Sequence, residues 1–151
     1  MIVLSIDIGG EAGTGIVIYD SEAQKIMLSE TFTTRSKSAG VIDFFYQIDS
    51  YINRYSPDLI IMPTPTAYRS AIKLHYQKIG VVRILADESR SMVIIVVDSN
   101  CKKLVFGEGS ADKEFIAKAL IKERKLKTEH ERDAFMFIKA WETGDVKIQD
   151  S

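Results

Sequence analysis

Two short segments of the sequence carry carboxylates in positions where a metal ion could use them. Near the start, Asp7 lies in the run Ile6-Asp7-Ile8-Gly9-Gly10, at the edge of an apolar stretch. Near the end, the run His130-Glu131-Arg132-Asp133-Ala134 places further carboxylates at the edge of another one. A divalent-metal site on a mixed sheet usually recruits carboxylates that are far apart in sequence. If the two segments meet in space, the fold is one that handles phosphodiesters.

A third apolar run, from Pro57 to Pro63, lies between these segments and ends in proline. A metal site at the ends of neighbouring strands would gain from a carboxylate at that point, and proline has no ligand atom to offer. The residue at the end of this run therefore bears directly on whether such a site could be catalytic.

The composition predicts one globular domain, because 151 residues with 46% apolar content can bury a substantial core. The single cysteine, Cys101, argues against a disulfide framework or a structural zinc site, and we expect a cytoplasmic protein.

We expect no membrane association, because the start lacks a basic leader and no stretch approaches the roughly 20 apolar residues that span a bilayer. The net charge of -1 gives no overall attraction to nucleic acid, so such binding would need a local basic face.

Hydrophobic periodicity predicts the order of the elements. Strands are expected over 2–8, 15–20, 25–34, 59–62 and 92–97, and helices over 39–55, 66–87, 111–124 and 129–142. The first two strands read as a hairpin, and the last strand, with five consecutive β-branched residues, is expected in the centre of the sheet. The polar tail from Thr143 to Ser151 is expected to be frayed.

This order, an antiparallel meander followed by parallel crossovers, is typical of an α/β layered sheet of the ribonuclease H kind. The segment from Asp98 to Ile116 carries Lys102-Lys103 and then Gly107-x-Gly109-x-Ala111-x-Lys113-Glu114, and it resembles the same region of RuvC-type Holliday junction resolvases. The first strand with its glycine turn, the strand after Pro57, the helix around 70–80 and the last helix are similar to that family in the same order. The resemblance implies a ribonuclease H-like domain over 1–142, built on a five-stranded mixed sheet flanked by helices, with a tail over 143–151.

The resemblance also implies a set of metal ligands. Asp7 matches the aspartate that ends the family's first strand, and Asp133 matches the aspartate of its last helix; both bind Mg²⁺ in the family. His130 matches a position that holds aspartate or histidine, and its spacing from Asp133 puts the two on one helix face. The family's fourth ligand is a glutamate at the place of Pro63, and the loop that follows is shorter here.

The activity that these matches imply is metal-dependent cleavage of branched DNA, by in-line attack of water on a phosphodiester with Mg²⁺ or Mn²⁺ as cofactor. Asp7, His130 and Asp133 are the expected catalytic residues, with His130 as ligand or base. The alternative is a non-catalytic member of the family. In that case, proline at position 63 indicates that cleavage has been lost, while DNA binding or assembly persists. A third reading is an unrelated scaffold protein.

Basic residues and glycines near the expected metal ligands predict a DNA-binding face. Lysines there could contact phosphates, and glycines could let backbone amides approach them. The predicted nucleic-acid-binding residues are Arg69, Lys73, Lys102, Lys103, Gly107, Gly109, Lys113 and Lys118. Acidic residues are interspersed, so the same charges could simply form solvated helix faces. We expect branched DNA as the partner and a homodimer as the assembly.

Structural explanations compete with the catalytic ones. Asp7 could cap the glycine turn, and the acids near His130 could stabilise the first turn of a helix. Thr128 and Glu131 form a capping-box pair, which assigns Glu131 to structure. Glu11 could replace the missing glutamate, and His75, on a helix with lysines, is expected at the surface.

The glycine turn after Asp7 also resembles that of actin-like sugar kinases and chaperone ATPases. Those proteins close two such subdomains around a nucleotide, and a chain of this length has room for one.

Overall fold

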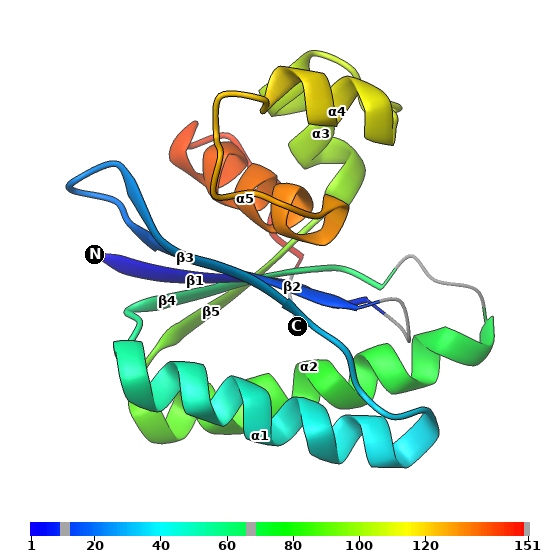
Figure 1. Cartoon of the computed structure of the whole chain (residues 1–151). Coiled ribbons are helices and arrows are strands. Elements are labelled where there is room, and N and C mark those ends of the chain that lie inside the picture. The colour runs from blue at the N-terminus through cyan, green and yellow to red at the C-terminus, as the bar shows by residue number, and fades with distance from the viewer. Residues whose placement is uncertain (10–12, 66–68, 150–151) are drawn as a thin grey trace.

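The computed structural model describes residues 1–9, 13–65 and 69–149, with the side chains of 69–71 excepted. The strands are β1 (Ile2–Asp7), β2 (Thr14–Asp20), β3 (Lys25–Phe32), β4 (Leu59–Pro63) and β5 (Met92–Val96). The helices are α1 (Lys37–Tyr55), α2 (Arg69–Ser89), α3 (Asp98–Phe106), α4 (Lys113–Ala119) and α5 (Glu129–Glu142). The strands form one sheet in the order β3-β2-β1-β4-β5, with helices on both faces (Figure 1).

The sheet is mixed, as the sequence predicted. β1, β2 and β3 form an antiparallel meander, and β1, β4 and β5 are parallel neighbours. Parallel strands require crossover connections, and α1 and α2 supply them. The expected five-stranded mixed sheet flanked by helices is therefore confirmed.

Alternation along the strands divides the core into two halves, because successive side chains point to opposite faces. Leu4, Ile6 and Ile60 belong to the half that α1 and α2 cover. Val3, Leu59 and Ile61 belong to the half covered by α5, against which α3 packs. Figure 1 shows α1 and α2 on one side of the sheet and α3, α4 and α5 on the other. The described part of the chain contains no helix that is both long and apolar enough to cross a membrane.

β5 lies at an edge of the sheet, so its prediction as a central strand was wrong. The polar tail explains how an edge can be so rich in β-branched residues. Ile148 forms an antiparallel bridge with Val96, and the backbone amide of Gln149 donates to the carbonyl of Ile95 at 2.8 Å. The tail therefore covers part of the open edge instead of fraying, which is a common way of protecting an edge strand.

The region between β5 and α5 also differs from its prediction. A helix over 111–124 was expected, but α4 covers only Lys113–Ala119, starting where the Asp112 carboxylate accepts from the amide of Phe115 at 2.9 Å. Helix α3 was not predicted at all. It ends at Gly107, whose φ of 84° is the left-handed conformation that closes many helices.

His75 is buried, with 8% of its surface exposed, so the expectation of a surface position was wrong. It lies one helical turn before the buried Ile79, on the face of α2 that packs against the sheet. Burial lowers the pKa of His75, and the nearby charge of Lys78 lowers it further. The Nε2 atom of His75 has no hydrogen-bond partner among the described residues.

Candidate metal and nucleic-acid site

Three parallel strands end in one row at the same edge of the sheet. Ser5 of β1 pairs with Ile61 of β4, so the same register places Asp7 beside Pro63. Pro63 in turn pairs with Val96 of β5. The alternation of the strands directs Asp7 toward the face that α5 covers, because Val3 belongs to that half of the core.

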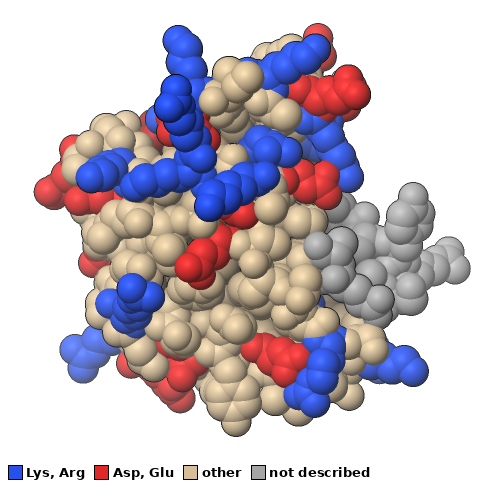
Figure 2. All heavy atoms as spheres, in the orientation of Figure 1, with Lys and Arg blue, Asp and Glu red and all other residues tan. Residues whose placement is uncertain are grey.

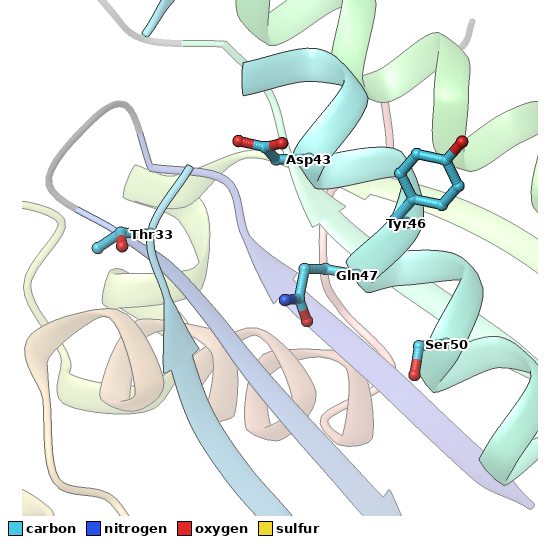
Figure 3. Close-up of a pocket in the computed structure, with 5 residues that line it drawn as sticks. All are labelled: Thr33, Asp43, Tyr46, Gln47 and Ser50. Atoms are coloured by element: carbon cyan, nitrogen blue, oxygen red, sulfur yellow. The ribbon is translucent and has the colours of Figure 1, made fainter. Parts of the chain in front are cut away.

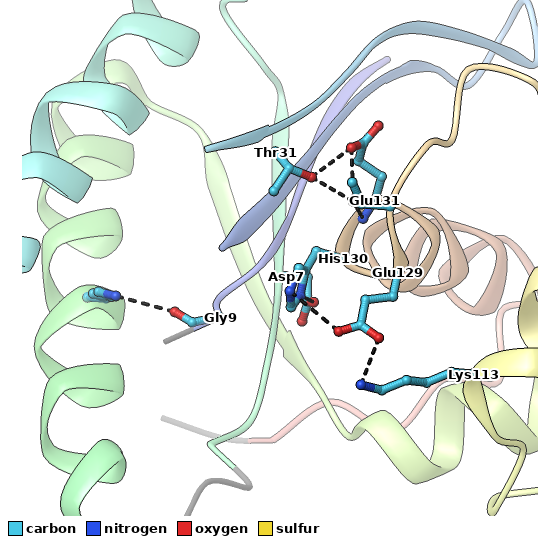
Figure 4. Close-up of polar contacts among 9 residues, drawn as sticks. Asp7, Gly9, Thr31, Lys113, Glu129, His130 and Glu131 are labelled. Atoms are coloured by element: carbon cyan, nitrogen blue, oxygen red, sulfur yellow. Dashed lines mark hydrogen bonds and ion pairs between the residues drawn. The ribbon is translucent and has the colours of Figure 1, made fainter. Parts of the chain in front are cut away.

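Helix α5 begins at this row because a buried carboxylate anchors its first turn. The Thr128 hydroxyl caps the helix by accepting from the amide of Glu131 at 3.1 Å. Glu131, 2% exposed, accepts from the hydroxyl of Thr31 of β3 at 2.7 Å (Figure 4). It also accepts from the hydroxyls of Ser29 at 2.7 Å and Thr128 at 2.9 Å. Burial alone would raise the pKa of Glu131, but these hydrogen bonds outweigh it and hold the pKa below its usual value. The structural role predicted for Glu131 is confirmed.

Replacing Glu131 with glutamine should destabilise the fold by about 2–4 kcal/mol, because an amide nitrogen would face hydroxyl donors in a buried position. The lowered pKa of Glu131 stabilises the fold above its usual pKa of 4.5, and that contribution disappears as the pH falls through the folded-state value. Urea unfolding at pH 7 and at pH 3 should therefore show a large difference between variant and wild type that narrows in acid. The matched control is Glu114→Gln in the exposed first turn of α4.

Gly15 of β2 allows α5 to approach the sheet closely. A Cβ atom at this position would lie 2.3 Å from both the carbonyl carbon and the carbonyl oxygen of His130, and 2.8 Å from the amide nitrogen of Glu131. Only glycine leaves space for this contact between backbones. Gly15 pairs with Asp7 in the β1–β2 ladder, so the close contact lies directly beside the candidate site.

Asp7 and His130, which are distant in sequence, meet at this point. The Nδ1 atom of His130 lies 3.0 Å from the Asp7 Oδ2 atom, and each side chain is 16% exposed (Figure 4). The Nε2 atom of His130 lies 3.6 Å from Glu129, whose other carboxylate oxygen is 2.8 Å from the Lys113 ammonium. The structure thus brings together two of the three expected metal ligands and adds an ion pair beside them.

Asp133 belongs to the same electrostatic cluster. Burial, together with the negative charges of Asp7 and Asp98, raises the pKa of Asp133 to about 7, although the positive charges of Lys102 and His130 lower it. Burial likewise raises the pKa of Asp7, although the hydrogen bond with His130 opposes it. That hydrogen bond raises the pKa of His130. The site therefore gathers more negative charge than its own cations neutralise.

This charge balance fits a divalent cation, since buried carboxylates and an imidazole are suitable ligands for Mg²⁺ or Mn²⁺. Over the described ranges, however, no three His, Cys, Asp or Glu side chains are gathered closely enough to hold an ion as placed. Asp7 is paired with His130 instead, and Asp98 with Lys102 at 3.1 Å. Ion binding would require these two pairs to open. Glu11, the suggested substitute for the missing glutamate, lies outside the described residues.

Sequence patterns did not single out Asp98 as a member of this cluster. The sequence did contain an indication for Asp98, because an acid that directly follows a β-branched strand often begins a helix. The segment had been considered for its lysines and glycines, and α3 was not expected there. The carboxylate of Glu129 was missed for a similar reason, because an acid in the first turn of a helix already has a structural explanation.

A separate hollow of about 350 Å³ lies on the α1 side of the sheet, lined by Thr33, Asp43, Tyr46, Gln47 and Ser50 (Figure 3). Asp43, the carboxylate among the described lining residues, is held by Arg35 at 2.8 Å, and this pairing lowers the pKa of Asp43 to about 2. The hollow therefore lies across the sheet from α5 and is not part of the Asp7–His130 cluster.

No protein-family model and no curated protein matches the chain. Among solved structures, the RuvC structure of Thermus thermophilus matches with a TM-score of 0.77 at 20% identity, over 99% of this chain and 100% of that one. T. thermophilus RuvC in complex with a Holliday junction substrate matches at 0.75 and 21% identity, over 99% of both chains. This chain has the RuvC fold. Fowlpox virus resolvase, solved with substrate Holliday junction DNA, matches at 0.62 and 15% identity, over 93% of this chain and 99% of that one.

Within the RuvC fold of this chain, the residues predicted to bind nucleic acid fall into two groups. Lys102, Lys103, Gly107, Gly109, Lys113 and Lys118 all lie in or between α3 and α4. Arg69 and Lys73 lie at the start of α2 instead, where Lys73 is exposed and the Arg69 side chain is outside the described part. Figure 2 shows lysine and arginine side chains gathered over α3 and α4, with acidic side chains among them.

Some members of the first group already have structural roles. Lys102 is paired with Asp98, and Lys113 with Glu129. Gly107 closes α3 in the left-handed conformation, while a Cβ on Gly109 would come within 3.2 Å of a backbone carbonyl oxygen. Lys103 and Lys118 are exposed, and they appear in no ion pair among the described residues. They are the members of the group that are best placed to meet a phosphate.

Proposed function

We propose that this protein is a divalent-metal-dependent endonuclease that acts on branched DNA as a homodimer. The observation that carries the proposal is the contact between Asp7 at the end of β1 and His130 on α5, with the charge of Asp133 close enough to interact with both. A buried group of acids at strand ends, on a fold shared with Holliday junction resolvases, is suited to phosphodiester chemistry.

Each residue of the cluster has a distinct task in this proposal. A bound Mg²⁺ or Mn²⁺ would supply Lewis-acid stabilisation of the charge that develops on the phosphate. Asp7 and Asp133 would hold the ion, and desolvation would strengthen their attraction for it. His130, which lies beside Asp7, would take a proton from the attacking water. Glu131 and Gly15 position His130 by fixing the first turn of α5.

The test is cleavage of a labelled four-way DNA junction, with a linear duplex of the same sequence as the control. We expect cuts in the junction that require a divalent ion, at a slow rate because Pro63 supplies no carboxylate. We expect Mn²⁺ to support cleavage better than Mg²⁺, because Mg²⁺ demands near-ideal octahedral geometry, which a ligand set without a carboxylate at Pro63 does not favour. Junction binding without cleavage in either metal would instead establish the non-catalytic alternative, which Pro63 favours.

The exposed lysines of α3 and α4 should provide much of the DNA affinity. The double variant Lys103→Glu and Lys118→Glu should weaken junction binding about tenfold or more and should reduce the dependence of affinity on salt, because fewer counterions are released. Gel-shift titrations at several salt concentrations measure both quantities. The control is Lys25→Glu and Lys37→Glu, which makes the same change of charge at exposed positions of β3 and α1. Equal losses in both variants would show that net charge, and not this face, determines binding.

A further inference from the structure

We propose that Asp98, at the start of α3 just after the neighbouring strand β5, supplies the metal-binding carboxylate that β4 lacks at Pro63. This inference rests on the proposed function and extends it by one residue. No pattern in the sequence assigned this role to Asp98, and the role follows from where the sheet places it.

The register of the parallel strands brings Asp98 to the row in which Asp7 and Pro63 lie. Pro63 pairs with Val96, and the amide of Thr64 donates to the carbonyl of Val96 at 2.8 Å, so β4 and β5 stay together to their ends. Val96 faces the half of the core that α5 covers. Asp98 comes two residues later, at the first position of α3, and α3 packs against α5. A side chain there can reach the space that a longer residue at Pro63 would occupy.

The packing of α3 against α5 places the Asp98 side chain beside the cluster. This side chain is 26% exposed, which leaves it less accessible than a free surface acid. Carboxylates from the end of β1, the start of α3 and α5 thus lie near the end of β4, where proline contributes none.

A positive charge already stands in this position. The Lys102 ammonium lies 3.1 Å from Asp98, and its side chain is 24% exposed. A divalent ion would bring more positive charge to the same place. In this proposal Lys102 occupies the site in the absence of metal and leaves Asp98 when an ion binds.

A purely structural role for Asp98 makes a different prediction. An acid in the first turn of a helix and an i,i+4 ion pair would each stabilise α3 by a few tenths of a kcal/mol up to about 1 kcal/mol. In that case a change of Asp98 would alter the stability of α3 and leave ion affinity unchanged. Ion binding by the purified full chain without DNA therefore separates the two roles.

The experiment measures Mn²⁺ affinity from the paramagnetic resonance signal of free Mn²⁺, with thermal unfolding to show that each variant is folded. Asp98→Asn should weaken Mn²⁺ binding about tenfold or more. Lys102→Met should strengthen it, because the ion no longer competes with an ammonium. Pro63→Glu should restore most of the affinity that Asp98→Asn loses, because it returns a carboxylate to the same space. The control is Glu129→Gln, a neighbouring acid whose carboxylate is held by Lys113, and we expect a smaller loss.

The outcomes distinguish this inference from the proposed function. If Asp7→Asn leaves Mn²⁺ affinity unchanged, the metal site of the proposed function is wrong. If Asp7→Asn abolishes binding but Asp98→Asn and Lys102→Met both leave it unchanged, only the role of Asp98 is wrong. Equal losses in Asp98→Asn and Glu129→Gln would reduce the role of Asp98 to a general effect of charge and would also overturn the inference. The Lys102→Met result keeps the test decisive if Pro63→Glu does not fold.

Discussion

Replacing Asp133 with asparagine should abolish metal-dependent cleavage and at the same time stabilise the metal-free protein at neutral pH. Burial and the charges of Asp7 and Asp98 raise the pKa of Asp133 from 3.8 to about 7. The folded state therefore binds the proton more tightly than the unfolded state does. The cost of ionising Asp133 in the fold grows as the pH rises from about 4 to about 7 and is complete above that range. Asparagine keeps the shape and removes the charge, for a gain on the order of 2 kcal/mol.

Thermal unfolding between pH 4 and pH 8, without divalent ions, measures this effect. The wild-type midpoint should fall across the range, while that of Asp133→Asn should stay flatter and end higher. Adding Mn²⁺ should raise the wild-type midpoint and leave the variant unchanged, because an ion stabilises only the state that binds it. Asp145→Asn, which removes an exposed acid beyond α5, is the matched control. A variant that is no more stable than wild type at pH 8 would show that ionised Asp133 does not destabilise the fold.

Such a gain in stability would have a functional reason. Active sites often hold charges that the fold alone would not favour, and their removal commonly stabilises a protein at the expense of activity. Here Glu131 and Asp133 lie on the same helix with opposite electrostatics. Glu131 meets several hydroxyl donors and has a lowered pKa, whereas Asp133 meets other acids and has a raised one. The first acid holds α5 in place, and the second is left ready for a cation.

The sequence predicted the elements with strong periodicity and the residues next to them. The sequence alone predicted the range of α5, its Thr128 cap and the structural role of Glu131. These features depend on neighbours within one turn of helix. The meeting of Asp7 with His130 was expected from the family resemblance and not from any local pattern. Local sequence determines local structure well, and it carries little information about which distant elements touch.

The errors in prediction have the same origin. Five consecutive β-branched residues predicted a central position for β5, because nothing local shows that the tail will return to cover its edge. His75 was placed at the surface because lysines share its helix, yet it lies on the face of α2 that packs against the sheet. Asp98 was overlooked because its importance comes from strand register across Pro63 and Val96. Each of these facts is fixed by contacts between residues that are far apart in the chain.

Gly15 offers the clearest test of how such a distant contact builds the site. Gly15→Ala should destabilise the protein by about 1–3 kcal/mol and should reduce junction cleavage by about 10²-fold. The added Cβ would meet backbone atoms of His130 at 2.3 Å, and a backbone cannot rotate away as a side chain can. The first turn of α5 must therefore move away from β2 by an ångström or so. A displacement of that size at a catalytic group is enough for a loss of this order.

The control for this prediction is Gly80→Ala in α2, where a Cβ would meet nothing within 4 Å. That change should be neutral or stabilising by up to about 1 kcal/mol, because alanine favours helix more than glycine does. Urea unfolding and junction cleavage should be measured on both variants, together with the Mn²⁺ affinity of each. Because Gly15 touches neither the ion nor the DNA in this proposal, its effect on cleavage must pass through the position of His130. A Gly15→Ala variant that stays folded and cleaves at the wild-type rate would show that the site tolerates movement of α5. The geometric basis of the proposed mechanism would then be wrong.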